Sequence, residues 1–395
     1  MLIFASAMKQ RLCPCCFSPL IFLLLIVSLT EILFSCRPHS TQSSRPLRPD
    51  SSAVIRYANG FSIDYFRNYT RLTVYNPWKK REISAIYYLI SHPGILTPDS
   101  KSTIIVPLHS MVATSCTHVA FLEALHALQT LTGMASPQLV YSVAFHQFNA
   151  EGKILDLGDP FHINLEKTMV LHPQIVMMTN YNQVNASADQ LVEAGIPVVY
   201  NNEWMESSPL GRAEWIKFVA AFYLKGEFAD SLFRTMTARY FALKMLAHQT
   251  TSRPTILVGN NFKGTWYMPS GTGFMGHLLA DAQCSYYFSN DTTIGSLPVN
   301  FEQVLQHFRN ASVWLNCSII NLTTLQNSDP RYRLFKSFQS KQVYCLNGRV
   351  TTTGGNDFWE SGVVHPDILL RDYIRVLHPE LLPNQQLVYL LKMTE

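Results

Sequence analysis

The sequence predicts an α/β protein with two lobes of mainly parallel sheet, flanked by helices and joined by a long rigid helix. From residue 102 onward, short apolar β-branched runs alternate with stretches of helical spacing, which is typical of parallel sheets covered by helices. The same layout recurs after Arg253. Between the two blocks, residues 210–248 are dominated by helix formers and contain no Pro, which predicts one long helix.

The first 36 residues have the features of a secretory lipoprotein signal. Lys9 and Arg11 precede an apolar run that ends in Leu33-Phe34-Ser35-Cys36. This ending looks like a lipobox, in which the cysteine carries lipid and becomes the first mature residue, so Cys36 is the predicted lipidation site. A transmembrane anchor is the alternative, because the run approaches spanning length. Residues 37–52, rich in Ser, Pro and Arg, are expected to form a flexible tether.

The next two segments are a β-rich N-terminal extension over residues 53–100 and an N-terminal α/β lobe over residues 101–208. Aromatic and β-branched runs predict strands in the extension, at 61–63, 72–75 and 85–90. In the lobe, the patterns predict strands at 103–107, 175–178 and 197–200, with helices at 117–131 and 188–194.

A linking helix is expected over residues 209–250, with a break at Gly226 as the alternative, and a C-terminal α/β lobe over residues 251–395. The second lobe has predicted strands at 255–259, 313–315 and 342–344, and predicted helices at 274–280, 301–308 and 366–377. Ligands favour domain interfaces and the carboxyl ends of parallel strands, so a ligand cleft is expected between the lobes.

Charge and motif content exclude several function classes. Charged residues make up only 15% of the chain and the net charge is +4, so no nucleic-acid surface is expected. No HExxH or G-x-S-x-G motif occurs, and Thr265 stands where a P-loop needs Lys. We therefore expect no enzyme, no resident cofactor and no metal site. The cysteines beyond the signal are expected to be free, with one disulfide as the alternative: Cys116, Cys284, Cys317 and Cys345.

Several stretches resemble the ABC-importer binding proteins that carry cobalamin, ferric siderophores or haem, and in particular Bacteroidetes lipoproteins of that group. The resemblance covers residues 55–390 and rests on the order and spacing of five motifs. They are Asn164 to Val176 (NLEKTMVLHPQIV), Ala194 to Val199 (AGIPVV), Pro298 to Leu305 (PVNFEQVL), Pro209 to Trp215 (PLGRAEW) and Gly354 to Glu360 (GGNDFWE). His172 and Gln174 depart from the family's common Lys and Asp. The resemblance implies a fold similar to class III periplasmic binding proteins.

In the resembled family, one surface Glu on each lobe meets arginines of the permease, which makes Glu166 and Glu302 the matching docking residues. Each opens a helix after an asparagine, where a carboxylate is favoured by the helix dipole. The alternative is that each glutamate only caps its helix.

Six residues in loops after strands are candidates to line the cleft, because flat ligands suit aromatic walls. They are His118, Trp204, Trp266, Tyr267, Phe358 and Trp359. The alternative for His118 is a helix cap or a buried histidine, and for each aromatic residue it is core packing. Asp357 and Glu360 are expected to satisfy backbone groups rather than to bind metal.

Together these features predict a periplasmic, membrane-anchored lipoprotein of an ABC importer, whose partners are the permease subunits, the membrane and the ligand. It would capture an iron chelate, that is a siderophore or haem, or cobalamin. Two alternatives stay open: a lipid-anchored enzyme or metal-chelate processing protein on the same scaffold, and a structural surface lipoprotein without a small ligand.

Overall fold

The computed structural model describes residues 48–183 and 185–395. Cys36, the predicted signal and most of the predicted tether therefore lie outside the described residues. Within the described part, no helix combines the length and the apolar character needed to span a bilayer.

A five-stranded sheet with the order β1-β2-β3-β4-β5 begins the described chain. Its strands are β1 (Ser51–Ser52), β2 (Phe61–Tyr65), β3 (Thr70–Tyr75), β4 (Ile83–Ile90) and β5 (Thr103–Ile105). The three longest strands contain the stretches predicted at 61–63, 72–75 and 85–90. The strand predicted at 103–107 was assigned to the first lobe, and this assignment is wrong. β5 pairs in parallel with β4 and so belongs to the N-terminal sheet.

The first lobe is built on a fully parallel sheet with the order β12-β11-β6-β7-β8. Its strands are β6 (Met111–Ala113), β7 (Leu131–Met134), β8 (Leu155–Asp156), β11 (Ile175–Met178) and β12 (Val198–Tyr200), beside a hairpin of β9 (Gly158–Asp159) and β10 (His162–Ile163). Its helices are α2 (Cys116–Ala124), α3 (Val143–Ala150), α4 (Leu165–Leu171) and α5 (Ala186–Glu193). The helix expected over 117–131 is too long, because the chain turns at His126 with φ +50° and Leu131 begins β7.

The linking segment is two helices rather than one, α6 (Pro209–Ala221) and α7 (Gly226–Ala247), which pack against each other. Leu224 adopts φ +56°, which a continuous helix cannot contain. Tertiary contacts fix the break: Lys225 Nζ donates to Leu125 O (2.6 Å), and Leu108 N donates to Phe222 O (3.0 Å). The single long helix is therefore wrong, and the break lies next to Gly226.

The second lobe contains a sheet with the order β13-β17-β18-β19 and a three-stranded antiparallel sheet, β14-β15-β16. The strands are β13 (Ile256–Val258), β17 (Val313–Cys317), β18 (Val343–Cys345), β19 (Leu391–Lys392), β14 (Asn261–Phe262), β15 (Thr265–Pro269) and β16 (Ser296–Val299). The helices are α8 (Phe274–Asp281), α9 (Phe301–Phe308), α10 (Leu322–Ser328), α11 (Lys336–Gln339) and α12 (Pro366–Leu377). β13, β17 and β18 are parallel, as in the first lobe, whereas β19 is antiparallel.

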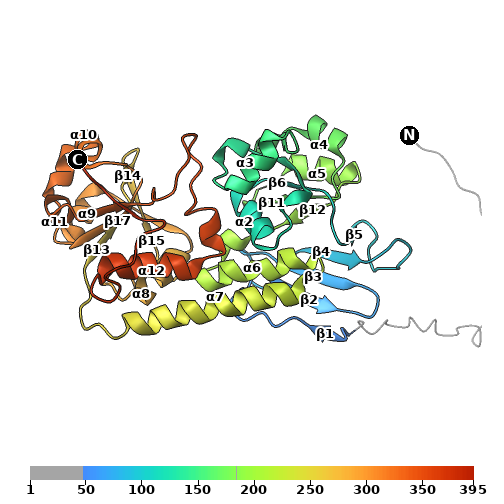
Figure 1. Ribbon diagram of the computed structural model, residues 1–395, viewed down its shortest axis with the longest axis horizontal. Coiled ribbons are helices and arrows are strands. Elements are labelled where there is room, and N and C mark those ends of the chain that lie inside the picture. The colour runs from blue at the N-terminus through green and yellow to red at the C-terminus, as the bar shows by residue number, and fades with distance from the viewer. Residues whose placement is uncertain (1–47, 184) are drawn as a thin grey trace, which may run out of the picture. The chain divides into compact units, whose positions relative to one another are not determined.

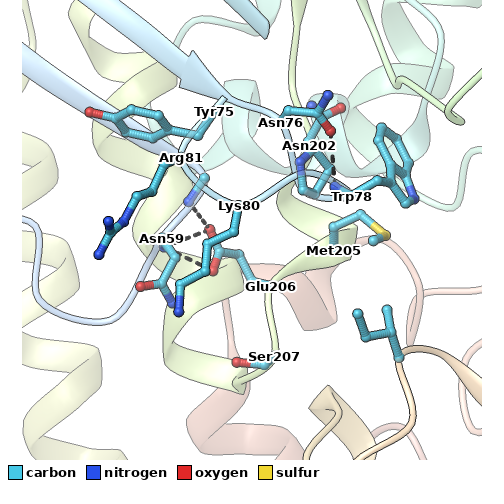
Figure 2. Close-up of a pocket in the computed structure, with 13 residues that line it drawn as sticks. Asn59, Tyr75, Asn76, Trp78, Lys80, Arg81, Asn202, Met205, Glu206 and Ser207 are labelled. Carbon is cyan, nitrogen blue, oxygen red and sulfur yellow. Dashed lines mark hydrogen bonds between the residues drawn. The ribbon is translucent and has the colours of Figure 1, made fainter. Parts of the chain in front are cut away.

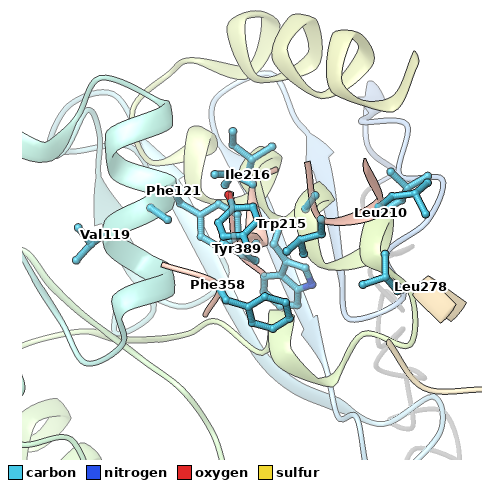
Figure 3. Close-up of a cluster of buried hydrophobic side chains, with 14 of the residues drawn as sticks. Val119, Phe121, Leu210, Trp215, Ile216, Leu278, Phe358 and Tyr389 are labelled. Carbon is cyan, nitrogen blue, oxygen red and sulfur yellow. The ribbon is translucent and has the colours of Figure 1, made fainter. Parts of the chain in front are cut away.

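The two lobes share one continuous apolar core around α6 (Figure 3). Phe121 of α2, Trp215 of α6 and Leu278 of α8 are all fully buried in it. Below the lobes, α7 packs along α12 (Figure 1), and Arg239 Nε lies 2.6 Å from Asp367 Oδ2. The resulting scaffold is an α/β protein of two lobes, joined by a helical hairpin.

Candidate ligand cleft

The strands β11 and β12 are parallel neighbours, so the loops that follow them begin side by side at the carboxyl edge of the sheet. Buried amides shape both loops. Asn202 Oδ1 accepts a hydrogen bond from Asn180 N (3.1 Å), and Asn201 Oδ1 accepts one from Glu203 N (3.2 Å). This bonding presents Tyr181 and Trp204, which are 42% and 38% exposed, at the carboxyl edge of the sheet.

Four rings form a continuous aromatic row along this edge: Trp78, Trp204, Tyr181 and Phe161. The ring centroids are 6.4 Å apart for Trp78 and Trp204, 5.5 Å for Trp204 and Tyr181, and 4.9 Å for Tyr181 and Phe161. Phe161 is 56% exposed. Exposed aromatic rings at such spacings offer a flat ligand a stacking surface.

The aromatic row joins two hollows. The larger, about 580 Å³, lies between the β3–β4 turn, the residues just before α6, and Ile294 of the second lobe (Figure 2). The smaller, about 370 Å³, is lined by Phe161 of the β9–β10 turn, by Tyr181 and its neighbours after β11, and by Tyr200 of β12. Volumes of this order suit small-molecule ligands.

Buried charges lie beneath the aromatic row. Arg212 Nη2 is 3.7 Å from Glu203 Oε1, and its guanidinium stacks 4.7 Å from the ring centroid of Phe274. Burial raises the pKa of Glu203, and the Arg212 charge opposes that rise. Glu203 Oε2, Arg212 Nε and Asn202 Nδ2 have no hydrogen-bond partner among the described residues. Unpaired buried polar atoms are rare in structural cores, so this cluster marks the floor of the cleft as a functional candidate.

Of the six candidate cleft residues, three are exposed. Trp204 belongs to the aromatic row, Tyr267 is 52% exposed on β15, and Trp359 is 47% exposed in the loop that precedes α12. Their part in ligand binding stays a prediction.

The other three candidates, His118, Trp266 and Phe358, are core residues, which corrects their assignment to the cleft wall. His118 is fully buried in α2, and burial lowers its pKa to about 3. Trp266 is fully buried, donates from Nε1 to Val258 O (2.8 Å) and stacks on Trp314. Phe358 is 3% exposed and packs on Tyr389. Neighbouring residues such as Trp266 and Tyr267, or Phe358 and Trp359, therefore differ in whether they lie in the core or at the surface, and tertiary packing sets that difference.

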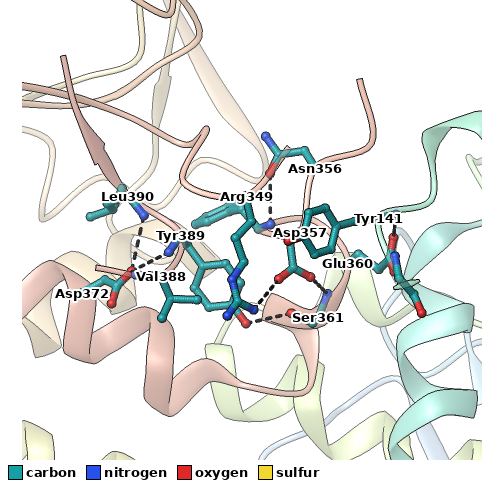
Figure 4. Close-up of polar contacts among 12 residues, drawn as sticks. Tyr141, Arg349, Asn356, Asp357, Glu360, Ser361, Asp372, Val388, Tyr389 and Leu390 are labelled. Carbon is teal, nitrogen blue, oxygen red and sulfur yellow. Dashed lines mark hydrogen bonds and ion pairs between the residues drawn. The ribbon is translucent and has the colours of Figure 1, made fainter. Parts of the chain in front are cut away.

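The Gly354–Glu360 loop of the second lobe docks on the first lobe (Figure 4). Glu360 accepts hydrogen bonds from Tyr141 N (2.6 Å) and Ser142 N (2.9 Å). An added Cβ at Gly355 would lie 2.7 Å from Val140 O, so only glycine fits there. Asp357 pairs with Arg349 (3.1 Å) and accepts from Ser361 N. The prediction that Asp357 and Glu360 satisfy backbone groups is confirmed.

Glu166 and Glu302 both lie in the first turn of a surface helix, α4 and α9. Asparagines cap these helices: Asn164 Oδ1 accepts from Lys167 N, and Asn300 forms a reciprocal capping box with Gln303. Both glutamates are exposed, and Glu302 lies 3.4 Å from Arg331. The alternative that the glutamates cap their helices is therefore wrong.

Within residues 48–183 and 185–395, no three or more His, Cys, Asp or Glu side chains gather closely enough to hold a metal ion. The four cysteines in this part of the chain are free, as expected, and three of them are buried.

Sequence reasoning missed Trp78, Phe161 and Tyr181. Tyr181 follows a predicted strand directly, so the rule that ligands meet strand ends could have found it. Trp78 and Phe161 lie far from it in sequence, and no local signal links them.

The sequence profile described as "Periplasmic binding protein" matches residues 113–349, more than half of the chain. An uncharacterized lipoprotein of Methanocaldococcus jannaschii is 25% identical over 86% of this chain and 85% of its own length. A periplasmic haem binding protein of Vibrio cholerae has a TM-score of 0.52 at 15% identity, covering 66% of this chain and 99% of its own. A structure from an ABC-type Fe³⁺-hydroxamate transport system of Saccharomonospora viridis has a TM-score of 0.54 at 14% identity, covering 78% and 98%. These two similarities show the fold.

Proposed function

The chain belongs to the periplasmic binding protein family, and on that premise we propose that it is the ligand-capturing lipoprotein of an ABC importer. Its ligand is an iron chelate, that is a siderophore or haem, or cobalamin. It is held between the lobes and delivered to a membrane permease. Cys36 carries the lipid that anchors the protein outside the cytoplasm. The relatives named as lipoproteins and the neighbours named for haem and Fe³⁺-hydroxamate support this assignment.

The aromatic row is the observation that carries the proposal. Catecholate, porphyrin and corrin ligands all present extended flat or apolar faces, and stacked rings stabilise such faces while the rim stays wet. The row crosses two hollows that together are large enough for a chelate of this class. Trp204 lies at its centre, with Trp78 on one side and Tyr181 on the other.

Ligand binding is tested by thermal unfolding of the purified protein with haemin, ferric siderophores and cyanocobalamin. A binder present at about 100 times its Kd stabilises the fold by about 2.7 kcal/mol, which raises Tm. Trp204→Ala should lower the affinity about tenfold or more, whereas Phe228→Ala, which removes an equally exposed ring on α7, should not. Ligand turnover, or a complete lack of binding, would contradict the proposal.

Docking to the permease is assigned to Glu166 and Glu302. Exposed carboxylates on separate lobes suit an interface that fixes orientation by charge complementarity. Glu166→Arg combined with Glu302→Arg should abolish uptake in cells and leave the Kd for ligand unchanged. Glu227→Arg is the matched control, because Glu227 is also an exposed carboxylate in a first helical turn. Normal uptake by the double variant would refute the docking assignment.

A further inference from the structure

One wall of the larger hollow comes from the β3–β4 turn (residues 76–82), which lies outside the matched family region of 113–349. We infer that this turn forms the wall of the cleft that selects ligands by their charge, and that the ligand is an anion with a flat face. Trp78 of the turn extends the aromatic row, and Lys80 and Arg81 add positive charge beside it. The inference rests on the proposed function and names the ligand's charge class.

The turn is held in one conformation by its own hydrogen bonds. Asn76 Oδ1 accepts from Trp78 N (2.9 Å) and Lys79 N (3.2 Å), and Asn76 N donates to Glu82 O (2.8 Å). Asparagine commonly stabilises turns in this way. Trp78, Lys80 and Arg81 are therefore presented from a fixed backbone, which reduces the entropy cost of binding.

The turn is also fixed to the first lobe. Tyr87 Oη of β4 accepts a hydrogen bond from Tyr200 N at the end of β12 (3.0 Å). Glu206, just before α6, accepts from Asn59 N and Gly60 N, which immediately precede β2. The N-terminal sheet and the loop that carries Trp204 thus form one preorganised wall.

The charges of the turn are distributed unevenly. Lys79 pairs with Glu82 (3.4 Å), outside the hollow. Lys80 and Arg81 line the hollow, are exposed, and have no ion-pair partner among the described residues. Glu206 is the acidic residue in the lining, and its carboxylate accepts from Asn59 N and Gly60 N (Figure 2). It also accepts from Trp215 Nε1. Lys80 and Arg81 face one carboxylate, that of Glu206, so the net charge of the lining is positive.

Arg81 has φ +69°, a left-handed conformation that favours glycine. A turn selected for stability alone would carry Gly or Asn at this position. Glycine at this position would relieve the strain, so Arg81→Gly removes the charge without a backbone cost.

The test uses two variants of the full chain, Lys80→Ala with Arg81→Gly, and Lys79→Ala as the neighbouring control. Arg81→Gly removes the charge while relieving the left-handed strain, so the double variant should keep its Tm. Four probes are titrated by fluorescence quenching: haemin, haemin dimethyl ester, a ferric tris-catecholate with three negative charges, and a neutral ferric trihydroxamate.

We expect the wild-type protein to bind an anionic probe, haemin or the tris-catecholate, more tightly than the neutral probes. The double variant should bind that probe about tenfold more weakly, with less dependence on salt, and Lys79→Ala should change Kd less than about twofold. Unchanged affinity in the double variant, or preference for a neutral probe, overturns the inference and leaves the proposed function standing. Binding of none of the four probes by the wild-type protein overturns the inference, and it contradicts the proposed function as well if cyanocobalamin also fails to bind.

Discussion

Three buried carboxylates join segments that are far apart in the sequence. Glu206 and Glu214 receive backbone N–H groups of residues 56–60, and Glu360 receives those of Tyr141 and Ser142. Each satisfies donors that would otherwise be unpaired away from water. Glu214 belongs to the Pro209–Trp215 motif, and Glu206 accepts from Trp215 Nε1 of the same motif. Glu360 explains the Gly354–Glu360 motif. Both motifs therefore serve the assembly of the fold.

Glu360 makes the stability of the fold depend on pH. Burial raises its pKa from 4.5 to about 7, although the two backbone hydrogen bonds oppose the rise. The folded protein thus binds this proton more tightly than the unfolded chain does. The stability that Glu360 contributes is present in full below pH 4.5 and is lost as pH rises through about 7.

Glu360→Gln removes this titration and keeps an acceptor for one N–H donor. Between about pH 5 and pH 8, the Tm of the wild-type protein should fall relative to that of the variant. Fluorimetric melting curves across this range measure the difference. Parallel Tm profiles for the two proteins would show that Glu360 titrates normally.

Among the elements, prediction succeeded where a local pattern and a local terminator agree. The helices predicted at 301–308 and 366–377 match α9 and α12 residue for residue. Phe301, Val304 and Phe308 recur at helical spacing behind the Asn300 cap, and Pro366 opens α12. Prediction failed where distant contacts set the boundary, as at the α6–α7 break, or where strands such as β8 and β19 span only two residues.

The α6–α7 break supplies a prediction of its own. Leu224 is 64% exposed and held at φ +56°, so its side chain gains little burial while its backbone is strained. Leu224→Asn should raise the free energy of unfolding by about 0.5–1 kcal/mol, because asparagine tolerates this conformation better. Urea denaturation measures the change. A lower midpoint would mean that the leucine side chain contributes more than its backbone costs.

At the scale of the whole molecule, the paired-lobe scaffold could be predicted from sequence but the aromatic row could not. The repeated alternation of strands and helices is encoded in short sequence patterns, so it can be predicted from the sequence alone. Predicting the row requires knowing that the β3–β4 turn, the β9–β10 turn and the ends of β11 and β12 converge, which only tertiary structure shows. Trp204 was found because it follows a strand, and Trp266 was misplaced by the same rule.

The continuous core predicts that the lobes unfold together. α6 packs against elements of both lobes, and α7 packs along α12 of the second, so the main apolar core spans both lobes, and only a smaller cluster around Val176 and Leu191 lies within the first lobe alone. Scanning calorimetry should give one transition whose calorimetric and van't Hoff enthalpies agree. Two resolved transitions would show that the lobes are independent domains.

The carboxylate contacts from Glu206, just before α6, and from Glu214 of α6 to residues 56–60 also bear on the order in which the chain can fold during synthesis. Glu206 and Glu214 emerge about 150 residues after the backbone they bind, so residues 56–60 reach their native contacts only once α6 has been made. β19 pairs with β18 through Leu391, and the second lobe is finished later still. Such long sequence separations slow folding and leave sheet edges open meanwhile, so the nascent protein should depend on chaperones that shield those edges.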